Sequence, residues 1–582
     1  MVQHDQFKSL RKEVLEIKDR HPQLSLDNAF VAWFLRAFIV DEEGMAIEAI
    51  KGGWKDKGVD AIFIDHETQI VFVIQGKYHE PEKVNPERRP DVIALADTGR
   101  VLKLEDRKGF DALLVEAHPT VKVALERVRE ALHKRNYRLT LQFITTGKVS
   151  ETHKEEACQR IEDWPNASFE VFGRQDLLRV MQDYIEGSSP PVPTIFLPIH
   201  GQELFNWYDE STRISRYVFT MLGQDLGKLY DDIGDRLFAR NIRGYQGDTK
   251  VNQDINSTLE KEPKYFWYFN NGVTVICDEA RQITEKDRRY LRVTNAQIIN
   301  GQQTVRILAS QGTSSATLIA KVIVVPRESE IGHTQYSYLV NQIVKATNWQ
   351  NKISQSDLKS NDVEQVKLER DFRKIGYLYL RKKQSVSEAQ RIFGDRYSYV
   401  VRKEEMAKCL GACLLDPYEV RKGKDRLFED DIYPRIFNQS PTAAYLTFYW
   451  LGRTASKFSR GDIRRGYAKW LVLNYLWREI GQSLTQPLLR ESFRYIAERE
   501  DKYEKELRPL YSAIEAIFRA TMAFYRQNRK TKDGILDEST FFKYAGRHNQ
   551  FLKYWNSAKN TRRGKVKKEL SSFVQNLKII ER

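Results

Sequence analysis

Three polar residues interrupt two apolar stretches near the N-terminus. Asp60 lies near the start of VDAIFID (59–65), and Gln75 and Lys77 lie two apart in QIVFVIQGKYH (69–79). These stretches are rich in Val, Ile and Phe and predict two strands. Because alternate side chains of a strand point to opposite faces, Gln75 and Lys77 share one face.

A tight hairpin between the two strands would bring Asp60 to that face. If Glu67 and Thr68 are the central residues of a two-residue turn, Asp60 falls opposite Gln75. Registers shifted by two residues keep Asp60 on the same face. An acid, an amide and a lysine on one side of a buried strand pair need an explanation, because burying unpaired polar groups costs free energy.

Metal-dependent phosphodiester cleavage is a chemistry that uses these three groups. Mg²⁺ or Mn²⁺ takes oxygen ligands, which the carboxylate of Asp60 and the amide oxygen of Gln75 would supply. A bound cation polarises a phosphate and lowers the pKa of a water ligand. Lys77 would stabilise the developing negative charge or position the water. Glu48, at the end of the preceding predicted helix, would add a carboxylate to the metal site, and Asp56 is a further acid near the hairpin entrance.

This arrangement resembles the PD-(D/E)XK nuclease superfamily, in its Mrr-like variant with glutamine in place of the second acid. The match runs from a helix with Glu48, through a strand with Asp60, to Gln75-Gly76-Lys77 after a hairpin. The resemblance implies a restriction-endonuclease-like α/β (α+β) domain, with a mixed sheet flanked by helices, and a Mg²⁺-dependent endodeoxyribonuclease activity. The neutral Gln75 predicts weaker metal affinity. The alternative is an ordinary amphipathic hairpin with exposed polar residues.

Other elements must position these residues. Helical spacing of apolar groups runs through residues 27–50, where Asp27 or Asn28 could cap the start. TLQFITTGK (140–148) predicts a further strand, and SFEVFGRQDLL (168–178) predicts a strand that leads into a helix. Both suit the mixed sheet that the resemblance implies.

The chain is predicted to have three domains. EGSSPPVPT (186–194) has two serines and three prolines in nine residues, which is typical of a linker. We therefore assign residues 1–186 to the nuclease-like domain, 187–334 to a mixed α/β region and 335–582 to a largely α-helical region. This last region includes a basic tail, because KNTRRGKVKK (559–568) has six Lys or Arg in ten residues. That tail is either a solvated helix face or a contact for a polyanion.

The middle of the chain carries a second resemblance. It rests on the stretches LFARNIRGYQGDTKVNQDINSTL (237–259), FWYFNNGVTVIC (266–277), NAQIINGQQTVRIL (295–308), NQIVKATNWQNKISQSDL (341–358) and FRKIGYLYLRKK (372–383). These stretches look like the AIPR (abortive infection phage resistance) family over roughly residues 200–480. The resemblance implies a role in defence against phage and does not define a reaction.

Two loops in this region are rich in amides and glycine, which suits a nucleotide or a nucleic-acid backbone. The residues are Asn270, Asn271, Gly272, Asn300, Gly301, Gln302 and Gln303. The second loop also looks like the GQxR-type loop of ParB-like nucleotide-binding domains, with Thr304 where arginine would stand. The alternative is a structural turn, since Asn-Gly is a strong hairpin signal. The Walker A pattern of a P-loop ATPase is absent.

Further polar residues could line a groove for a polyanion. They are Asn241, Arg243, Asn252 and the cluster Arg381-Lys382-Lys383. The whole chain has 94 Lys and Arg against 79 Asp and Glu, a formal net charge of +15. That excess favours DNA or another polyanion as partner. It is equally typical of a merely basic protein.

The remaining features limit the location of the chain. Its four cysteines form no zinc-type pattern, and Cys409 and Cys413 are expected in a helical core. This usage, and an N-terminus without an apolar signal region, predict a cytoplasmic protein. No apolar run approaches the about 20 residues that span a membrane.

These observations together predict a metal-dependent DNA endonuclease in anti-phage defence, either by abortive infection or by restriction. The AIPR region would sense or bind nucleic acid, a nucleotide or a phage-derived trigger. A homodimer would place two sites for cutting both strands. The alternative is a nucleic-acid- or nucleotide-binding sensor whose nuclease fold is inactive or depends on a partner.

Overall fold

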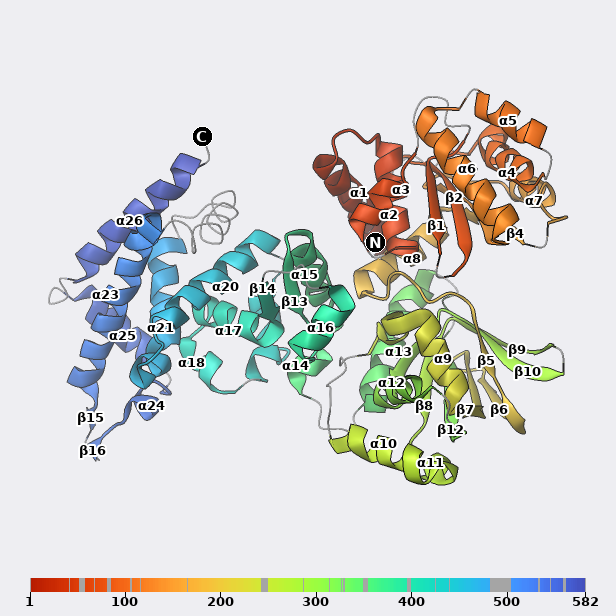
Figure 1. The fold of residues 1–582 in the computed structure, drawn as a ribbon. Helices are drawn as coiled ribbons and strands as arrows, with labels where there is room; N and C mark the ends of the chain where they lie inside the picture. The colour runs from red at the N-terminus through yellow and green to blue at the C-terminus, as the bar shows by residue number, and fades with distance from the viewer. Residues whose placement is uncertain are drawn as a thin grey trace. The chain divides into compact units, whose positions relative to one another are not determined.

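The chain folds into a mixed α/β first unit and a mainly helical second unit (Figure 1). The first unit is built from residues 1–241 and 248–347, and the second from residue 348 onward. The computed structural model describes all residues except 1, 41, 52–57, 67, 81–84, 105–106, 116, 165, 242–249, 286, 313–314, 326, 328–329, 349–353, 395–398, 424, 439, 482–503, 532–533, 545, 558–561 and 581–582.

A four-stranded sheet forms the N-terminal part of the first unit. Its order is β1 (Ala61–Asp65), β2 (Ile70–Lys77), β3 (Arg138–Thr145) and β4 (Ala167–Phe172). β1 and β2 are antiparallel, whereas β2, β3 and β4 run parallel. The central strand β2 is buried on both faces, as its nearly continuous apolar sequence requires. The strands predicted at 59–65, 69–79, 140–148 and 168–178 are confirmed.

Helices cover both faces of this sheet. One face packs against α1 (Val2–Arg20), α2 (Leu26–Phe38), α3 (Glu43–Ala49) and α8 (Arg174–Glu186). The other face packs against α4 (Arg89–Lys103), α5 (Arg107–Val115), α6 (Pro119–Lys134) and α7 (Glu151–Gln159). The sheet is therefore a mixed one between two helical layers.

The helix predicted over residues 27–50 is wrong in one respect, because the structure has two helices there. α2 ends where the backbone N–H groups of Ile39 and Val40 both donate to Leu35 O at 2.8 Å. The apolar spacing continues across the break because α3 packs onto the same core. The cap of α2 is also different, since Ser25 Oγ accepts the N–H of Asn28 at 3.0 Å.

Two further sheets follow α8 in the chain. A three-stranded sheet has the order β5 (Ile195–Pro198), β10 (Arg288–Thr294) and β9 (Glu279–Glu285). A five-stranded sheet has the order β11 (Gln297–Asn300), β8 (Val273–Cys277), β12 (Thr317–Val324), β7 (Ile214–Leu222) and β6 (His200–Asp209), with β6 at its edge.

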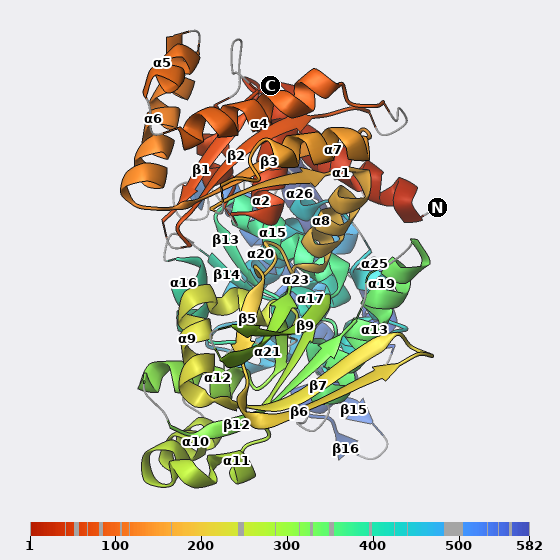
Figure 2. The same ribbon diagram turned by 90° about the vertical axis from the view of Figure 1, so that its right-hand side faces the viewer.

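One core joins these two sheets to the helices around them. Tyr217, Phe219 and Met221 of β7 point into it, together with Leu226 and Leu308. The helices of this part are α9 (Gly223–Ile233), η1 (Gly234–Phe238), α10 (Lys250–Lys261), η2 (Pro263–Tyr265), α11 (Phe266–Phe269), α12 (Gln302–Gln311) and α13 (Glu330–Asn348). Figure 2 shows α9 and α12 beside one another, next to the sheet.

The second unit is mainly helical, as predicted. Its longer helices are α15 (Val363–Lys374), α16 (Val386–Phe393), α17 (Lys403–Leu414), α20 (Thr442–Lys457), α21 (Ile463–Ile480), α23 (Glu504–Asn528), α25 (Arg547–Asn556) and α26 (Arg562–Ile580). The short elements are α14 (Gln355–Leu358), α18 (Pro417–Arg421), η3 (Arg426–Phe428), α19 (Tyr433–Ile436), α24 (Glu538–Phe541) and the strand pairs β13 (Tyr377–Leu380) with β14 (Tyr399–Arg402) and β15 (Lys530–Thr531) with β16 (Gly534–Ile535).

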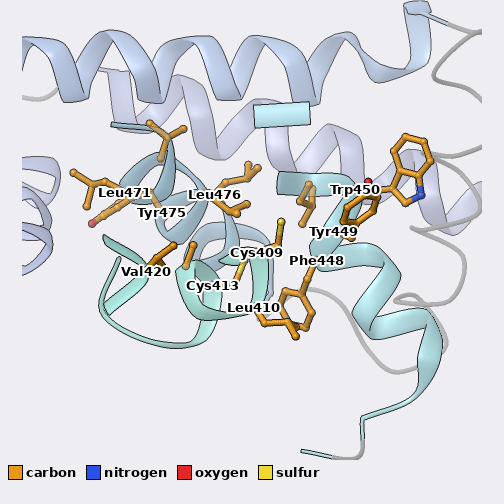
Figure 3. Packing of buried hydrophobic residues seen from close by; sticks show 14 of the residues in the cluster. Cys409, Leu410, Cys413, Val420, Phe448, Tyr449, Trp450, Leu471, Tyr475 and Leu476 are labelled. Atoms are coloured by element: carbon orange, nitrogen blue, oxygen red, sulfur yellow. The ribbon is translucent and has the colours of Figure 1, made fainter. Parts of the chain in front are cut away.

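Cys409 and Cys413 lie in the core of this second unit, which confirms their predicted place. Both are buried on α17 beside Leu410 and Leu476 (Figure 3). Burial raises the pKa of Cys409 to about 12. Its thiol is therefore neutral at physiological pH and behaves as a packing group.

The predicted basic tail is largely a packed helix. Val566, Leu570 and Phe573 of α26 are buried against the core of the second unit. Lys565 and Lys567 point outward and are exposed. Among the helices that the structure describes, none has the length and apolar character needed to cross a membrane.

Candidate functional site

The three polar residues of the N-terminal hairpin lie on one side of its sheet. Ala61 pairs with Ile74, so the next position brings Asp60 opposite Gln75, and Asp60 N donates to Ile74 O at 2.9 Å. The register is the one that the two-residue turn predicted. Side chains alternate along each strand, so Asp60, Gln75 and Lys77 face the side covered by α4 and α6.

Asp60 is fixed by the backbone around it. Its Oδ2 accepts the N–H of Gly76 at 2.8 Å, and its carbonyl accepts the N–H of Lys51 at 2.7 Å. Gly76 must be small, because a Cβ there would lie 2.3 Å from a methyl carbon of Val31. The half-buried carboxylate is therefore held at the end of β1, beside β2.

Gln75 is buried, with 5% of its surface exposed. With the amide turned to satisfy its neighbours, its nitrogen donates to Asp91 O at 3.0 Å and to Gly58 O at 3.3 Å. Those two bonds fasten Gln75 to the start of α4 and to the chain that enters β1. The amide oxygen is then the atom of Gln75 that a cation would take.

Lys77 is half-buried at the end of β2, where it pairs with Thr145 of the parallel strand β3. A polar cluster that the sequence analysis missed fixes this end of the strand. Glu87, almost fully buried, accepts from His79 Nε2 at 2.7 Å and from the hydroxyl of Thr145. A quarter of the His79 side chain is exposed.

Close backbone packing completes this cluster. A Cβ on Gly147 would lie 2.6 Å from Glu87 Oε1 and 2.5 Å from Asn85 O. His79 N donates to Thr146 Oγ1 at 2.7 Å. No spacing in the sequence links these residues, because they meet only through the parallel pairing of β2 with β3. They are positioning residues for the strand end that carries Lys77.

Glu48 is exposed on α3. The nearby backbone runs beside β1, because Ile50 forms an isolated bridge with Ala61. Asp56 and the rest of residues 52–57 lie outside the described residues. Within the part of the chain that the structure describes, no three His, Cys, Asp or Glu side chains gather as a metal site would require.

The donor set on the hairpin fits a hard cation that keeps several water ligands. Asp60 supplies a carboxylate, and Gln75 supplies an amide oxygen. Mg²⁺ is commonly bound through one or two carboxylates together with water and phosphate oxygens. The set therefore suits a cation shared with a phosphate substrate and does not form a closed protein cage.

The amide-rich loops are fastened internally. Asn270 Oδ1 accepts the N–H of Gly272 at 2.9 Å, and Asn270 Nδ2 donates to Thr304 Oγ1 at 3.2 Å. Asn300 Nδ2 donates to Thr347 O at 3.1 Å. Gly301 has a φ of +96° and is the N-cap residue of α12. These contacts agree with the structural-turn alternative.

The other residues of these loops differ in exposure. Asn271 is exposed, Gln302 is buried and Gln303 is half-buried. The Gln303 Oε1 is shielded from solvent and meets no hydrogen-bond donor among the described residues. A nucleotide site at these loops stays a prediction, and Asn271 and Gln303 are the loop side chains that are at least partly exposed and take no part in the contacts above.

The comparisons with known proteins address the middle and C-terminal parts of the chain. A family model described as AIPR protein matches residues 238–556, which is more than half of the chain. This chain belongs to the AIPR family. The family indicates a role in anti-phage defence. Neither the curated proteins nor the solved structures gave a match.

The AIPR match differs in extent from the predicted resemblance. It begins later than residue 200 and continues past residue 480 through α25. The N-terminal sheet with Asp60, Gln75 and Lys77 lies before the match. The family therefore says nothing about the chemistry of that sheet.

The polyanion groove predicted within the AIPR region is wrong for three of its six residues, whereas Lys382 is half-buried and Lys383 is exposed. Arg381 is buried and donates from Nε to Glu369 Oε2 at 2.9 Å and from Nη1 to Ser360 O at 3.0 Å. Asn241 and Asn252 are buried as well. Arg243 lies outside the described residues.

Proposed function

We propose that this AIPR protein is a metal-dependent DNA endonuclease in anti-phage defence, acting by abortive infection or restriction. The observation that carries the proposal is the alignment of Asp60, Gln75 and Lys77 on one face of the β1–β2 hairpin. The order of helix, antiparallel hairpin and parallel strand, with helices on both faces, supports it, since the resemblance to the PD-(D/E)XK superfamily implies that arrangement.

Each residue has a defined part in the proposed reaction. Asp60 and Gln75 would hold Mg²⁺ or Mn²⁺ through oxygen. Glu48 belongs to α3, which packs on the opposite face of the sheet, and would add its carboxylate past the end of β1. The bound cation would polarise the phosphate and acidify a water ligand. The Lys77 ammonium would stabilise negative charge on the phosphate oxygens. The contact of Gly76 with Asp60 and the cluster around Glu87 would keep both strand ends in register.

Plasmid cleavage tests the proposal. The purified protein should nick or degrade plasmid DNA with Mg²⁺ or Mn²⁺ and not with EDTA. Asp60→Ala and Lys77→Ala should each lower the rate by about 100- to 1000-fold, the usual effect of removing one transition-state contact. Lys134→Ala and Asp163→Ala are matched controls on exposed side chains, and both should cut at the wild-type rate. Cleavage that persists in both hairpin variants would remove the proposed site.

The second candidate is a nucleic-acid- or nucleotide-binding sensor whose nuclease fold is inactive or depends on a partner. The neutral Gln75 favours it, because the amide lacks the charge of the commoner acid and weakens a cation site. Methylated, unmethylated and single-stranded DNA and RNA should be tested with each metal. Binding to any of them without cleavage, at every metal concentration, would favour the sensor.

A further inference from the structure

The five-stranded sheet of the first unit has a second face, opposite its core. On β7, Tyr217, Phe219 and Met221 are buried, so Arg216 and Val218 point to the other side. Arg216 is exposed and Val218 half-buried. This second face is therefore open to solvent along β7.

Aromatic and basic side chains gather on this open face. The register places Phe205 of β6 beside Val218, and Val218 beside Lys321 of β12. The neighbouring row places Trp207 beside Arg216. Phe205 is 57% and Trp207 54% exposed, and Lys321 is exposed too. The Arg216 guanidinium lies 5.5 Å from the centre of the Trp207 ring.

The exposed aromatic rings of this face are unusual for a protein surface. Large aromatic side chains are usually buried, and contiguous exposed ones mark interaction sites. Asp209, at the end of the Trp207 row, is turned to its own loop, where it accepts from Ser211 N at 3.0 Å and Ser211 Oγ at 2.6 Å. The face therefore offers flat rings and positive charge to a partner.

We propose that this open face binds single-stranded nucleic acid. Bases would stack on Phe205 and Trp207, while phosphates would contact Arg216 and Lys321. Residues two apart on a strand lie about 6.5 Å apart on one face, which leaves room for a base on each ring. Stacking on a sheet needs splayed bases, so a duplex cannot use the rings. The inference does not depend on the proposed nuclease activity.

The strand order favours access to the rings. β6 is the edge strand of its sheet and carries both aromatic side chains, so a nucleic-acid strand can approach them from beyond the edge. Arg216 lies on β7, one strand further in, and Lys321 lies on β12, two strands further in. This order would place the bases of a bound nucleic acid at the edge of the sheet and its sugar-phosphate backbone over the inner strands.

Binding can be measured in EDTA with full-length protein, so that metal-dependent cleavage does not interfere. Fluorescence anisotropy would follow labelled single-stranded DNA, single-stranded RNA and duplex DNA of one sequence. Trp207→Ala and Phe205→Ala should each weaken single-strand binding by about 5- to 100-fold, the usual loss for one stacked base. Trp207→Phe keeps a ring and should retain most of the affinity. The single strand whose binding these substitutions weaken identifies the ligand as DNA, RNA or both.

The cations have their own signature in the same assay. Arg216→Ala should lower the slope of log affinity against log salt by about 0.7, the value for one phosphate contact on a single strand. Arg216→Lys should keep that slope yet bind less tightly, because lysine stacks less well on the ring. A slope unchanged by Arg216→Ala would contradict the phosphate contact.

Tyr544→Ala is the matched control. Tyr544 is 53% exposed, lies 5.5 Å from the Arg547 guanidinium and belongs to the second unit. The Tyr544→Ala protein should bind single-stranded nucleic acid with the affinity of the wild type. Three results would overturn the proposal: wild-type affinity in both Trp207→Ala and Phe205→Ala, an equal loss for duplex and single strand, or an equal loss in Tyr544→Ala. Wild-type unfolding temperatures would show that the variants are folded.

Discussion

At the scale of single residues, two glycines decide the shape of the amide-rich loops. Gly272 has a φ of +70°, and a Cβ there would lie 2.1 Å from Ile319 O of the neighbouring strand. A Cβ on Gly301 would lie 2.7 Å from a methyl carbon of Val273. Both positions exclude any side chain, so the Asn-Gly pairs serve the close approach of backbones.

Gly272→Ala and Gly312→Ala separate the two costs of replacing such a glycine. Gly312 has nearly the same φ, +69°, and a Cβ there meets nothing within 4 Å. Gly312→Ala should cost about 1–2 kcal/mol through the left-handed backbone alone. Gly272→Ala should cost at least about 1–3 kcal/mol more, because its methyl group overlaps backbone. Denaturant unfolding measures both, and equal losses would contradict the steric argument.

The candidate site could be predicted in part from residue spacing. The strand period and the turn length fix the pairing of Asp60 with Gln75, because both are local properties. The bonds from the Gln75 amide to Gly58 and Asp91 could not be predicted, since they depend on how α4 packs on the sheet. The pairing of His79 with Glu87 depends on the same long-range packing.

At the scale of elements, local periodicity predicted strands better than the ends of helices. Residues 27–50 keep one apolar pattern although the backbone breaks between α2 and α3, so periodicity could not show the break. In α26 the run of lysines hides an apolar face of Val566, Leu570 and Phe573. Charge density alone therefore predicted a tail where amphipathic spacing builds a packed helix.

A buried charge cluster fastens α8, the last helix of the N-terminal sheet, to the segments that follow. Asp183 Oδ1 accepts from Arg240 Nη2 at 3.2 Å and from Arg327 Nη2 at 2.7 Å. Arg240 also pairs with Glu186 at 2.8 Å, and Arg327 with Asp278 at 2.9 Å. Both arginine side chains are only 6% exposed. Asp183 therefore holds two buried cations at once.

Asp183→Ala should destabilise the first unit by about 3–5 kcal/mol, because it removes the carboxylate that both buried guanidinium groups share and leaves their N–H groups there without an acceptor. Arg179→Ala, on the same helix with about half of its side chain exposed, is the control and should change stability by no more than about 0.5 kcal/mol. Denaturant unfolding of the full chain gives both values. A loss in Asp183→Ala no larger than that of the control would show that the cluster does not hold α8 in place.

At the scale of the whole molecule, each apolar cluster formed by the described residues lies within one unit. The three clusters of the first unit use residues between 7 and 322, and the large cluster of the second uses residues between 368 and 574. The predicted boundary at 334/335 falls inside α13, which runs on to the end of the first unit. Separate cores imply that each unit can unfold by itself.

Unfolding at different pH values tests this independence through Lys403 of the second unit. Burial lowers the pKa of Lys403 to about 8, only partly offset by the carboxylates of Glu404 and Asp357. The unfolded chain therefore binds the proton more tightly, and the second unit should gain about 3 kcal/mol as pH rises from about 8 to 10.5. Lys403→Met should lack this gain, taken as the difference from wild type. Heating should show two transitions, of which Asp183→Ala shifts one and Lys403→Met changes the pH dependence of the other. A single transition that both variants shift would mean that the units unfold together.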